Sequence, residues 1–479
     1  MSPFASPNNS KPHIVIFPFM SKGHTIPLLH LAHLLRLRSA AITIFTTPAN
    51  HPFISQSLPS DDPNISIVDL PFPTNIPNIP ENIESTDKLS SMSLFVPFVN
   101  GTELMQNSFE NSLRTFHKQV TCIISDGFLH WTLQSASKFN IPRLSFYGMS
   151  YYAMALSRSV MVDGSLTSHD SGDEEFTVNS FPWIKLCRND FDDPFDKKDP
   201  RGAHLDFIIK ATTATANSYG IVVNSFYELE KPFIDHWANE GQPKAWSVGP
   251  FCLASPYKDE SGQKPKWIQW LDESGSTSPV LYVAFGSQAN ISQAQLIEIA
   301  HGLESSKARF LWVVRATSDC INDLEKRVKG RGIIVNEWVD QRQILEHPAV
   351  RGFLSHCGWN SVLEAICAAV PVLAWPMMAE QFINAKFVTE EIKIGLRVNT
   401  VDGFRKGFVT GESLKGTVME LMEGKIGKEL RVNVVEVAEA ARKAVAEGGS
   451  SWRDLNRLID ETRGQKEKEN NGVENDHVM

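Results

Sequence analysis

The sequence predicts an α/β protein whose two Rossmann-like domains each carry a parallel sheet and face each other across a cleft. Its 479 residues are too many for one ordinary domain, and 42% are hydrophobic, enough for two cores. In both halves, short apolar, β-branched runs alternate with helical stretches, which is the pattern of βαβ units. A Pro-, Gly- and Ser-rich segment at 249–266 separates the halves. We place the domains at 1–249 and 269–455, with a linker at 250–268 and a terminal segment at 456–479.

Each predicted element follows from this alternation. The first half has predicted strands at His13–Phe19, Ala41–Thr47, Ile65–Leu70, Cys122–Asp126, Arg143–Tyr147 and Ile221–Ser225, and helices at His24–Leu37, Glu103–Lys118 and Phe128–Phe139. The second half has predicted strands at Val280–Phe285, Arg309–Val314, Gly332–Val335, Val350–Leu354 and Val370–Trp375, and helices beginning near Ser292, Gln341, Trp359 and Glu380. Residues 163–200 are acidic and unpatterned, so we expect a surface excursion there. Residues 465–479 are charged and Asn-rich, which predicts a disordered tail.

Composition excludes several classes of protein. The net charge of −9 argues against nucleic-acid binding, which needs a clustered basic face. The sequence contains no run of about 18 apolar residues, so no membrane span is predicted, and the first residues lack the features of a signal peptide. The six cysteines show no metal-ligand spacing and predict reduced thiols. We expect a soluble, cytoplasmic monomer.

The strongest functional signal is the segment VRGFLSHCGWNSVLEAI, a buried strand followed by a helix beginning near Trp359. Ligands of open α/β sheets bind at the carboxyl ends of strands, and a helix start offers free N–H groups to a diphosphate. His356, Asn360 and Ser361 add side-chain donors there. Glu364 lies one helical turn deeper, where its carboxylate can accept hydrogen bonds from the hydroxyls of a ribose.

Further polar groups follow the neighbouring strands. Glu380 and Gln381 come after Val370–Trp375, and Trp338 follows the preceding strand with a flat face for a base. Singly, these residues fit a helix cap or a core tryptophan equally well. Their shared position at the carboxyl ends of consecutive strands favours a nucleotide or nucleotide-sugar site.

The 44 residues from Trp338 to Gln381 resemble the donor signature of plant family 1 UDP-glycosyltransferases. The resemblance extends from the KGHTIPLLHLA segment to the terminal helix near Trp452. It implies a GT-B-like fold with an acceptor-binding first domain and a UDP-sugar-binding second domain, and a terminal helix that packs back on the first domain. It also implies UDP-glucose as donor substrate, without cofactor or metal.

The same resemblance implies roles for individual residues. Trp338 would stack on uracil, whose edge the backbone of Val339 would hydrogen-bond, and Gln341 and Glu364 would hold the ribose. The diphosphate would be bound by four donors: Ser287, His356, Asn360 and Ser361.

Three residues would face the sugar, namely Trp359, Glu380 and Gln381. A glutamine at position 381 resembles the glucose-using members of the family. Trp359 argues against glucuronate as the sugar, because an arginine would be expected there to pair with the glucuronate carboxylate. Asp340 and Glu380 replace a commoner Pro and Asp.

A candidate catalytic pair lies in the first half. His24 follows the first strand at a helix start, which is expected to lower its pKa, and Asp126 ends the strand CIISD. From the residues alone, a dyad and two unrelated loop residues stay equally open. The resemblance implies that His24 is the general base and Asp126 its partner, so that UDP-α-glucose would yield a β-glucoside.

The acceptor side is expected in the first half, in an apolar pocket for a phenolic such as a flavonoid. The candidates, each equally readable as plain core, are Phe19, Met20, Leu94, Phe128 and Tyr147.

A metal-using enzyme would need an Asp-x-Asp at the diphosphate. The one at Asp190–Asp192 lies in the excursion, and we interpret it as a solvated acidic loop far from the donor block.

Three other functions stay open. C-glycosylation of a phenolic ring carbon would use the same fold and the same base. A dinucleotide oxidoreductase is disfavoured, because no G-x-G-x-x-G follows a strand. A non-catalytic protein that binds hydrophobic small molecules is disfavoured by the presence of both His24 and Asp126.

Overall fold

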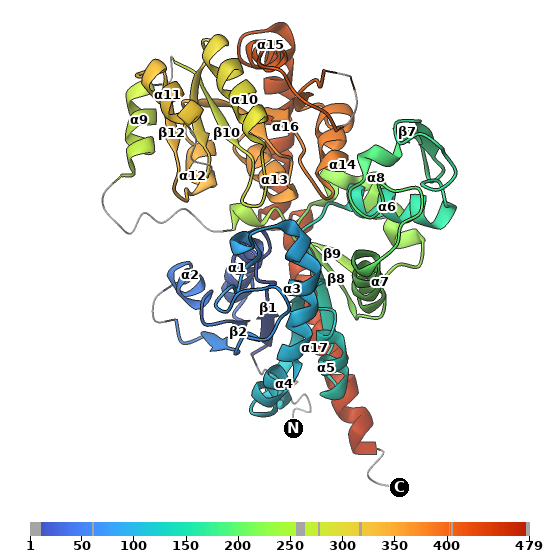
Figure 1. Ribbon diagram of the computed structural model, residues 1–479. Helices are drawn as coiled ribbons and strands as arrows, with labels where there is room; N and C mark the ends of the chain where they lie inside the picture. Colours follow the sequence, from blue (N-terminus) through green and yellow to red (C-terminus); the bar gives the residue numbers. More distant parts are fainter. Residues whose placement is uncertain are drawn as a thin grey trace.

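The computed structural model describes residues 11–59, 62–254, 264–275, 278–315, 319–401, 403 and 406–475. They form two α/β domains, which lie one above the other in Figure 1. The predicted linker falls partly outside the described residues, at 255–263, and the exact domain boundaries stay predictions.

The first domain contains a parallel sheet in the order β3-β2-β1-β4-β5-β8-β9. Its central strands are continuous apolar runs, as expected for strands covered on both faces. The strands are β1 (His13–Phe17), β2 (Ala41–Thr46), β3 (Ile65–Asp69), β4 (Val120–Asp126), β5 (Arg143–Tyr147), β8 (Gly220–Val223) and β9 (Ala245–Ser247). The helices are α1 (Lys22–Leu37), α2 (His51–Gln56), α3 (Phe95–Gly101), α4 (Gln106–Arg114), α5 (Thr132–Lys138), α6 (Tyr151–Asp163), α7 (Ala203–Ala216) and α8 (Tyr227–Asn239).

The second domain repeats this plan with a parallel sheet in the order β12-β11-β10-β13-β14-β15. Its strands are β10 (Val280–Ala284), β11 (Arg309–Val313), β12 (Gly332–Val335), β13 (Val350–Ser355), β14 (Val372–Ala374) and β15 (Gly395–Arg397). Its helices are α9 (Lys266–Ser274), α10 (Gln293–Ser305), α11 (Asp319–Arg327), α12 (Gln341–Leu345), α13 (Trp359–Cys367), α14 (Gln381–Lys386), α15 (Gly411–Met422) and α16 (Lys425–Val445). The short strands β9 and β15 were not predicted from the sequence.

In each sheet the strand order reverses between two central strands, β1 and β4 in the first sheet and β10 and β13 in the second. In the first sheet, β1 pairs with β2 on one side and with β4 on the other. In the second, β10 pairs with β11 and β13. Because connections leave such a pair in opposite directions, a crevice opens at its carboxyl end, and ligands of this fold class bind there. Each of these crevices is a topological switch point, and the fold places the two switch points opposite each other.

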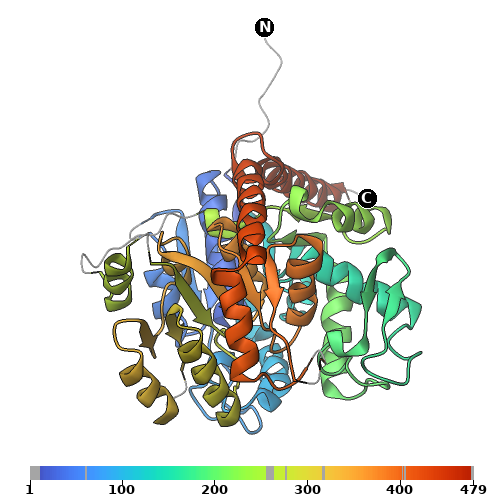
Figure 2. The same cartoon turned by 90° about the horizontal axis from the view of Figure 1, so that it is seen from above.

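The unpatterned segment at 163–200 is more ordered than predicted. It contains an antiparallel hairpin, β6 (Phe176–Val178) and β7 (Phe181–Leu186), and a 3₁₀ turn at Arg188–Asp190. Several of its apolar side chains pack into the same core as the second sheet. Figures 1 and 2 both place this hairpin region on the side of α14, and α6, which precedes it, contacts α14.

The last helix, α17 (Ser450–Asn475), returns from the second domain to pack on β9 and β4 of the first, as Figure 1 shows. Leu455, Leu458 and Ile459 are buried in the core of the first domain. The predicted disordered tail is wrong for residues 465–475, which are helical, because the packed turns supply a nucleus and Glu, Lys and Gln propagate a helix well. No helix within the described ranges is long and apolar enough to cross a membrane.

Candidate active site

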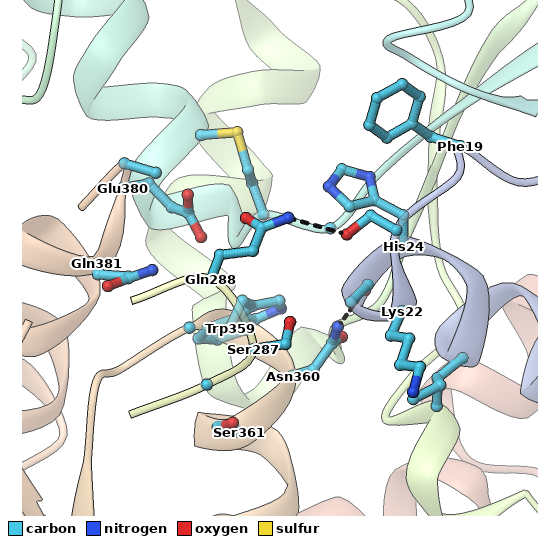
Figure 3. Close-up of a pocket in the computed structure, with 18 of the residues that line it drawn as sticks. Phe19, Lys22, His24, Ser287, Gln288, Trp359, Asn360, Ser361, Glu380 and Gln381 are labelled. Carbon is cyan, nitrogen blue, oxygen red and sulfur yellow. Dashed lines mark hydrogen bonds between the residues drawn. The ribbon is translucent and has the colours of Figure 1, made fainter. Parts of the chain in front are cut away.

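The two switch points open into one cavity of about 1580 Å³ between the domains. The first sheet contributes the ends of β1 and β4, and the second contributes the ends of β10, β13 and β14. The residues predicted for the donor site all line this cavity: Ser287, Trp338, Val339, Gln341, His356, Trp359, Asn360, Ser361, Glu364, Glu380 and Gln381. Figure 3 shows how residues from both domains point into it.

His24 and Asp126 meet on the wall formed by the first domain. His24 lies in the first turn of α1, and its Nδ1 is 2.7 Å from Oδ2 of Asp126, the last residue of β4. The other carboxylate oxygen, Oδ1, accepts the N–H of Phe128 at 3.0 Å. Because an ionised carboxylate only accepts hydrogen bonds, Nδ1 carries the proton. Nε2 is therefore the nitrogen left to take a proton from a ligand.

The pKa of His24 differs from the sequence-based expectation. Burial lowers this pKa, but the charge of Asp126, its hydrogen bond to the ring and the charge of Glu380 raise it above the ordinary value of 6.5. The expectation of a lowered pKa is wrong because two carboxylates outweigh the helix start and the burial. Burial in turn raises the pKa of Glu380.

A buried arginine, which sequence reasoning missed, lies behind Asp126. Arg143 of β5 donates from Nη2 to the backbone carbonyl of Asp126 at 3.3 Å and from Nε to Oγ of Ser125 at 2.9 Å. Burial lowers its pKa to about 10, so it stays charged at neutral pH. It follows Asp126 by 17 residues, and only the pairing of β4 with β5 brings the two together.

Direct hydrogen bonds join the loop and helix start that carry His24 to the second domain. Asn360 donates from Nδ2 to the carbonyl of Gly23 at 2.6 Å, so α13 holds the turn that carries His24. Gln288, after β10, donates to Oγ1 of Thr86 at 2.7 Å and to Oγ of Ser21 at 3.3 Å. Figure 3 shows Asn360 and Gln288 reaching from one domain toward the start of α1. Gln288 adjoins the predicted Ser287 and could have been included on that ground.

A buried network occupies the predicted ribose position. Gln341 donates from Nε2 to Glu364 at 2.6 Å and to Oγ of Ser361 at 2.8 Å, and its Oε1 accepts from Tyr282 at 3.2 Å. Burial raises the pKa of Glu364 to about 7. These groups are thus oriented before a ligand enters, and a ribose diol can replace Gln341 as donor to the carboxylate.

His356, which is predicted to bind the diphosphate, lines the cavity as a neutral ring. Burial lowers its pKa to about 4, and its Nδ1 is buried without a hydrogen-bond partner. A Cβ added at Gly286 or Gly358 would lie 2.7 or 2.6 Å from Nε2, so both glycines are required for the ring to fit. The ring therefore offers a fixed N–H rather than a charge.

Two side chains of the first domain pack against the predicted base platform, which stays half-exposed. Trp338 is 51% exposed, and the edge of Phe53 meets its ring at 6.2 Å between centroids. The ammonium of Lys22 lies 5.5 Å from the Trp338 centroid and 5.3 Å from that of Phe53. No sequence signal connects these residues, which come together only through the docking of the domains.

The predicted sugar-facing residues differ in what they have available. The indole N–H of Trp359 donates to the carbonyl of Asn224 at 2.7 Å, so this N–H is already used across the domain interface. Gln381 accepts the N–H groups of Met377 and Met378 with its Oε1, at 3.0 Å each. Glu380 presents a carboxylate to the cavity on the side of His24 (Figure 3).

Three of the five predicted acceptor residues line the cavity, namely Phe19, Phe128 and Tyr147. Phe128 packs against His24 at 4.9 Å between ring centroids and edge-on against Phe19 at 5.3 Å. Met20 is instead buried in the core of the first domain, because it points away from the cavity wall that Phe19 forms. Leu94 does not line the cavity either. Its neighbour Phe95 does.

The interpretation of Asp190–Asp192 as a solvated loop far from the donor block is wrong. Asp190 is 1% exposed and accepts the N–H of Cys187 at 2.9 Å. Asp192 lines the cavity and accepts the N–H of Ala379, inside the donor block, at 2.6 Å. The excursion reaches the second domain, which its sequence position does not indicate. Within the described part of the chain, no group of three or more His, Cys, Asp or Glu side chains is placed to hold a metal ion.

Comparison with known proteins agrees with this geometry. The family described as UDP-glucoronosyl and UDP-glucosyl transferase matches residues 255–436. UDP-glycosyltransferase 90A1 of Arabidopsis thaliana is 51% identical, over 96% of this chain and 98% of its own. UDP-glucose flavonoid 3-O-glucosyltransferase 7 of Fragaria ananassa is 36% identical, over 94% of this chain and 96% of its own.

A solved structure shares the whole architecture. Glycyrrhiza uralensis UGT73P12, complexed with glycyrrhetinic acid 3-O-monoglucuronide, aligns with a TM-score of 0.87 at 31% identity, over 98% of this chain and 99% of its own. The chain belongs to the plant family 1 UDP-glycosyltransferases, which are glycosyltransferases of the GT-B fold.

Proposed function

We propose that this enzyme transfers glucose from UDP-glucose to a hydroxyl of a small aromatic acceptor, a flavonoid or another phenolic, with inversion at the anomeric carbon. One observation carries the proposal. His24, whose ring is hydrogen-bonded to Asp126, lines the cavity from the first domain, and the donor block of the second domain lines the same cavity, so a base and a bound donor would share one space.

The chemistry is a single displacement. A phenol has a pKa near 10 and is protonated at neutral pH. Nε2 of His24 takes the phenolic proton while the oxygen attacks the anomeric carbon, and the bond from that carbon to the diphosphate oxygen breaks. Asp126 stabilises the imidazolium that forms, and UDP leaves on the opposite face of the sugar. General-base catalysis of this kind contributes about 10²–10⁴-fold to the rate.

The leaving diphosphate gains charge as the bond breaks. The start of α13, Oγ of Ser361 and the N–H of His356 line the same part of the cavity and are fixed by the protein. Donors that need no reorganisation stabilise developing charge strongly. These groups support a mechanism in which the protein supplies the electrostatic stabilisation without a metal ion.

Glucose is supported by the sugar-facing residues and by one relative. Gln381 closes the donor block, and Glu380 places a carboxylate where sugar hydroxyls need acceptors. The Fragaria ananassa protein carries UDP-glucose in its name. Its name also specifies a flavonoid and an O-glucoside, which supports a phenolic hydroxyl as the nucleophile.

The acceptor wall supports a flat aromatic substrate. Phe95, Phe128 and Phe207 meet edge to face, with centroids 5.3 to 5.9 Å apart, and all three line the cavity. Tyr147 adds a hydroxyl whose pKa burial raises to about 12, so it stays protonated and able to donate. An aromatic ring fits between such edges, and a hydroxyl of the ligand can lie near His24.

A direct transfer assay tests the proposal. The purified enzyme is incubated with UDP-glucose, UDP-galactose or UDP-xylose and a mixed panel of phenolics, terpenoids and hormones, and hexose or pentose addition is detected by mass spectrometry. We expect addition of a hexose from UDP-glucose to phenolics, and release of that hexose in mild acid. A product that survives mild acid would indicate C-glycosylation, and no transfer from any donor would reject the proposal. The monomeric state and cytoplasmic location stay predictions.

A further inference from the structure

The loop between β14 and α14 exposes three consecutive backbone N–H groups, and side chains satisfy all of them. Gln381 accepts the N–H groups of Met377 and Met378 at 3.0 Å each. Ala379 donates to Oδ2 of Asp192 at 2.6 Å. The third acceptor therefore comes from the other domain. The loop that carries the sugar-facing residues is complete only with a side chain of the acceptor-binding domain.

Ala379 is the member of this loop that most needs an external partner. Its φ of +53° lies in the left-handed region, which residues with a Cβ rarely adopt. It directly precedes Glu380, the N-cap residue of α14, so its conformation decides where the Glu380 carboxylate points. A backbone held in such a region persists only where its surroundings fix it.

Asp192 is itself held in place from both domains. Oδ1 of Asp192 lies 3.7 Å from the ammonium of Lys406 in the second domain. Lys406 also donates to the carbonyl of Phe191 at 2.7 Å and pairs with Asp196 at 3.2 Å. The preceding turn is fixed by the buried Asp190. These interactions hold the Asp192 carboxylate in place for its contact with Ala379, and 36% of the Asp192 side chain is exposed.

We propose that Asp192 is a positioning residue for the donor sugar, acting as the hydrogen-bond acceptor that holds Ala379 and thereby orients Glu380. Because its two ends belong to different domains, this hydrogen bond couples the sugar-binding geometry to the docking of the excursion on the donor domain. UDP makes no use of this loop, since it has no hexose. The inference rests on the proposed function, and it assigns the Asp-x-Asp segment a backbone contact rather than a metal.

Three variants separate the possible roles of the carboxylate. Asp192→Ala removes the acceptor, Asp192→Asn keeps an acceptor oxygen without the charge, and Asp199→Ala is the control. Asp199 lies in the same excursion, is solvent-exposed and pairs only locally with Arg201. For Asp192→Ala we expect the KM for UDP-glucose to rise about tenfold, as for a lost hydrogen bond, while the Kd for UDP changes less than about twofold. Asp192→Asn and Asp199→Ala should stay close to the wild type in both.

Amide hydrogen exchange of Ala379 gives a readout that does not need transfer activity. In the ligand-free enzyme we expect its exchange to become about tenfold faster in Asp192→Ala and to stay unchanged in the other two variants, with core strands unaffected. If the wild type transfers no hexose, the proposed function fails, while this measurement still decides the contact. Unchanged exchange in Asp192→Ala, or an Asp192→Asn variant as impaired as Asp192→Ala, would overturn the inference.

Discussion

Nδ1 of His24 lies 2.7 Å from Oδ2 of Asp126, although 102 residues separate them along the chain. The distance follows from topology, because β1 and β4 are neighbours in the sheet and each residue comes at or just after the carboxyl end of its strand. Asp126 is buried, with 1% of its side chain exposed, whereas 26% of the His24 side chain is exposed. A dyad in this position has one free nitrogen, and that nitrogen faces the cavity shared with the donor block.

Removing the base is the first test of this dyad. We expect His24→Ala to lower kcat by about 10²–10⁴-fold, because the acceptor hydroxyl then lacks a proton acceptor. The affinity for UDP, measured by calorimetry, should stay near that of the wild type. His301→Ala, on the exposed face of α10, is the matched control and should keep full activity. A His24→Ala variant with the wild-type transfer rate would reject the assignment.

The pH profile reports the charge that faces His24. His24 works in its neutral form, and its pKa is raised above 6.5, so kcat/KM should fall as the pH drops through a value above 6.5. In Asp126→Asn the larger of the two raising charges is gone, only Glu380 remains to raise the pKa, and burial still lowers it, so this acid limb should move to lower pH. We also expect kcat to fall, because the imidazolium loses its partner. An acid limb that stays in place or moves upward would contradict the role of Asp126.

Base stacking on Trp338 predicts a loss of nucleotide affinity. We expect Trp338→Ala to weaken UDP binding by about 1–3 kcal/mol, the range for stacking of a base on an aromatic ring. The measurement is the Kd for UDP and for uridine, which should change in parallel, since both carry the base. Trp183→Ala, at an exposed tryptophan that does not line the cavity, is the control. A loss restricted to UDP would place the effect at the diphosphate instead.

Metal removal should leave transfer intact. In the proposed donor site the diphosphate would face a helix start and side-chain donors, and Asp192 of the Asp-x-Asp segment accepts the N–H of Ala379. We therefore expect EDTA to change the initial rate by less than about twofold, compared with the same enzyme supplied with Mg²⁺. A rate that collapses in EDTA and returns with Mg²⁺ or Mn²⁺ would show that transfer requires a metal ion.

The parts of the fold and site that could be predicted from the sequence are those whose residues lie in one continuous segment of the chain. Buried parallel strands are continuous apolar runs, so most strands were found, while the short edge strands β9 and β15 were missed. The residues predicted for the donor site between Trp338 and Gln381 all line the cavity, because they lie at or near the carboxyl ends of recognisable strands and the starts of the helices that follow.

The contacts that could not be predicted from the sequence depend on the docking of one domain on the other. Asn224, Lys22 and Asp192 have partners 135, 316 and 187 residues away, and no local pattern indicates these contacts. The pKa of His24 was predicted with the wrong sign because the helix start was considered without the charge and hydrogen bond of Asp126 and the charge of Glu380, which approaches from the second domain. Met20 and Phe19 adjoin in sequence, but only Phe19 faces the cavity, because adjacent side chains leave the backbone in different directions.

The anomeric configuration of the product tests the central claim, a single in-line displacement driven by His24, most directly. The wild-type enzyme is supplied with UDP-α-glucose and a phenolic acceptor, and the coupling constant of the anomeric proton in the product is measured by NMR. A single displacement predicts only the β-glucoside, with the large coupling of two axial protons. An α-glucoside, or a mixture formed by the enzyme, would contradict the mechanism.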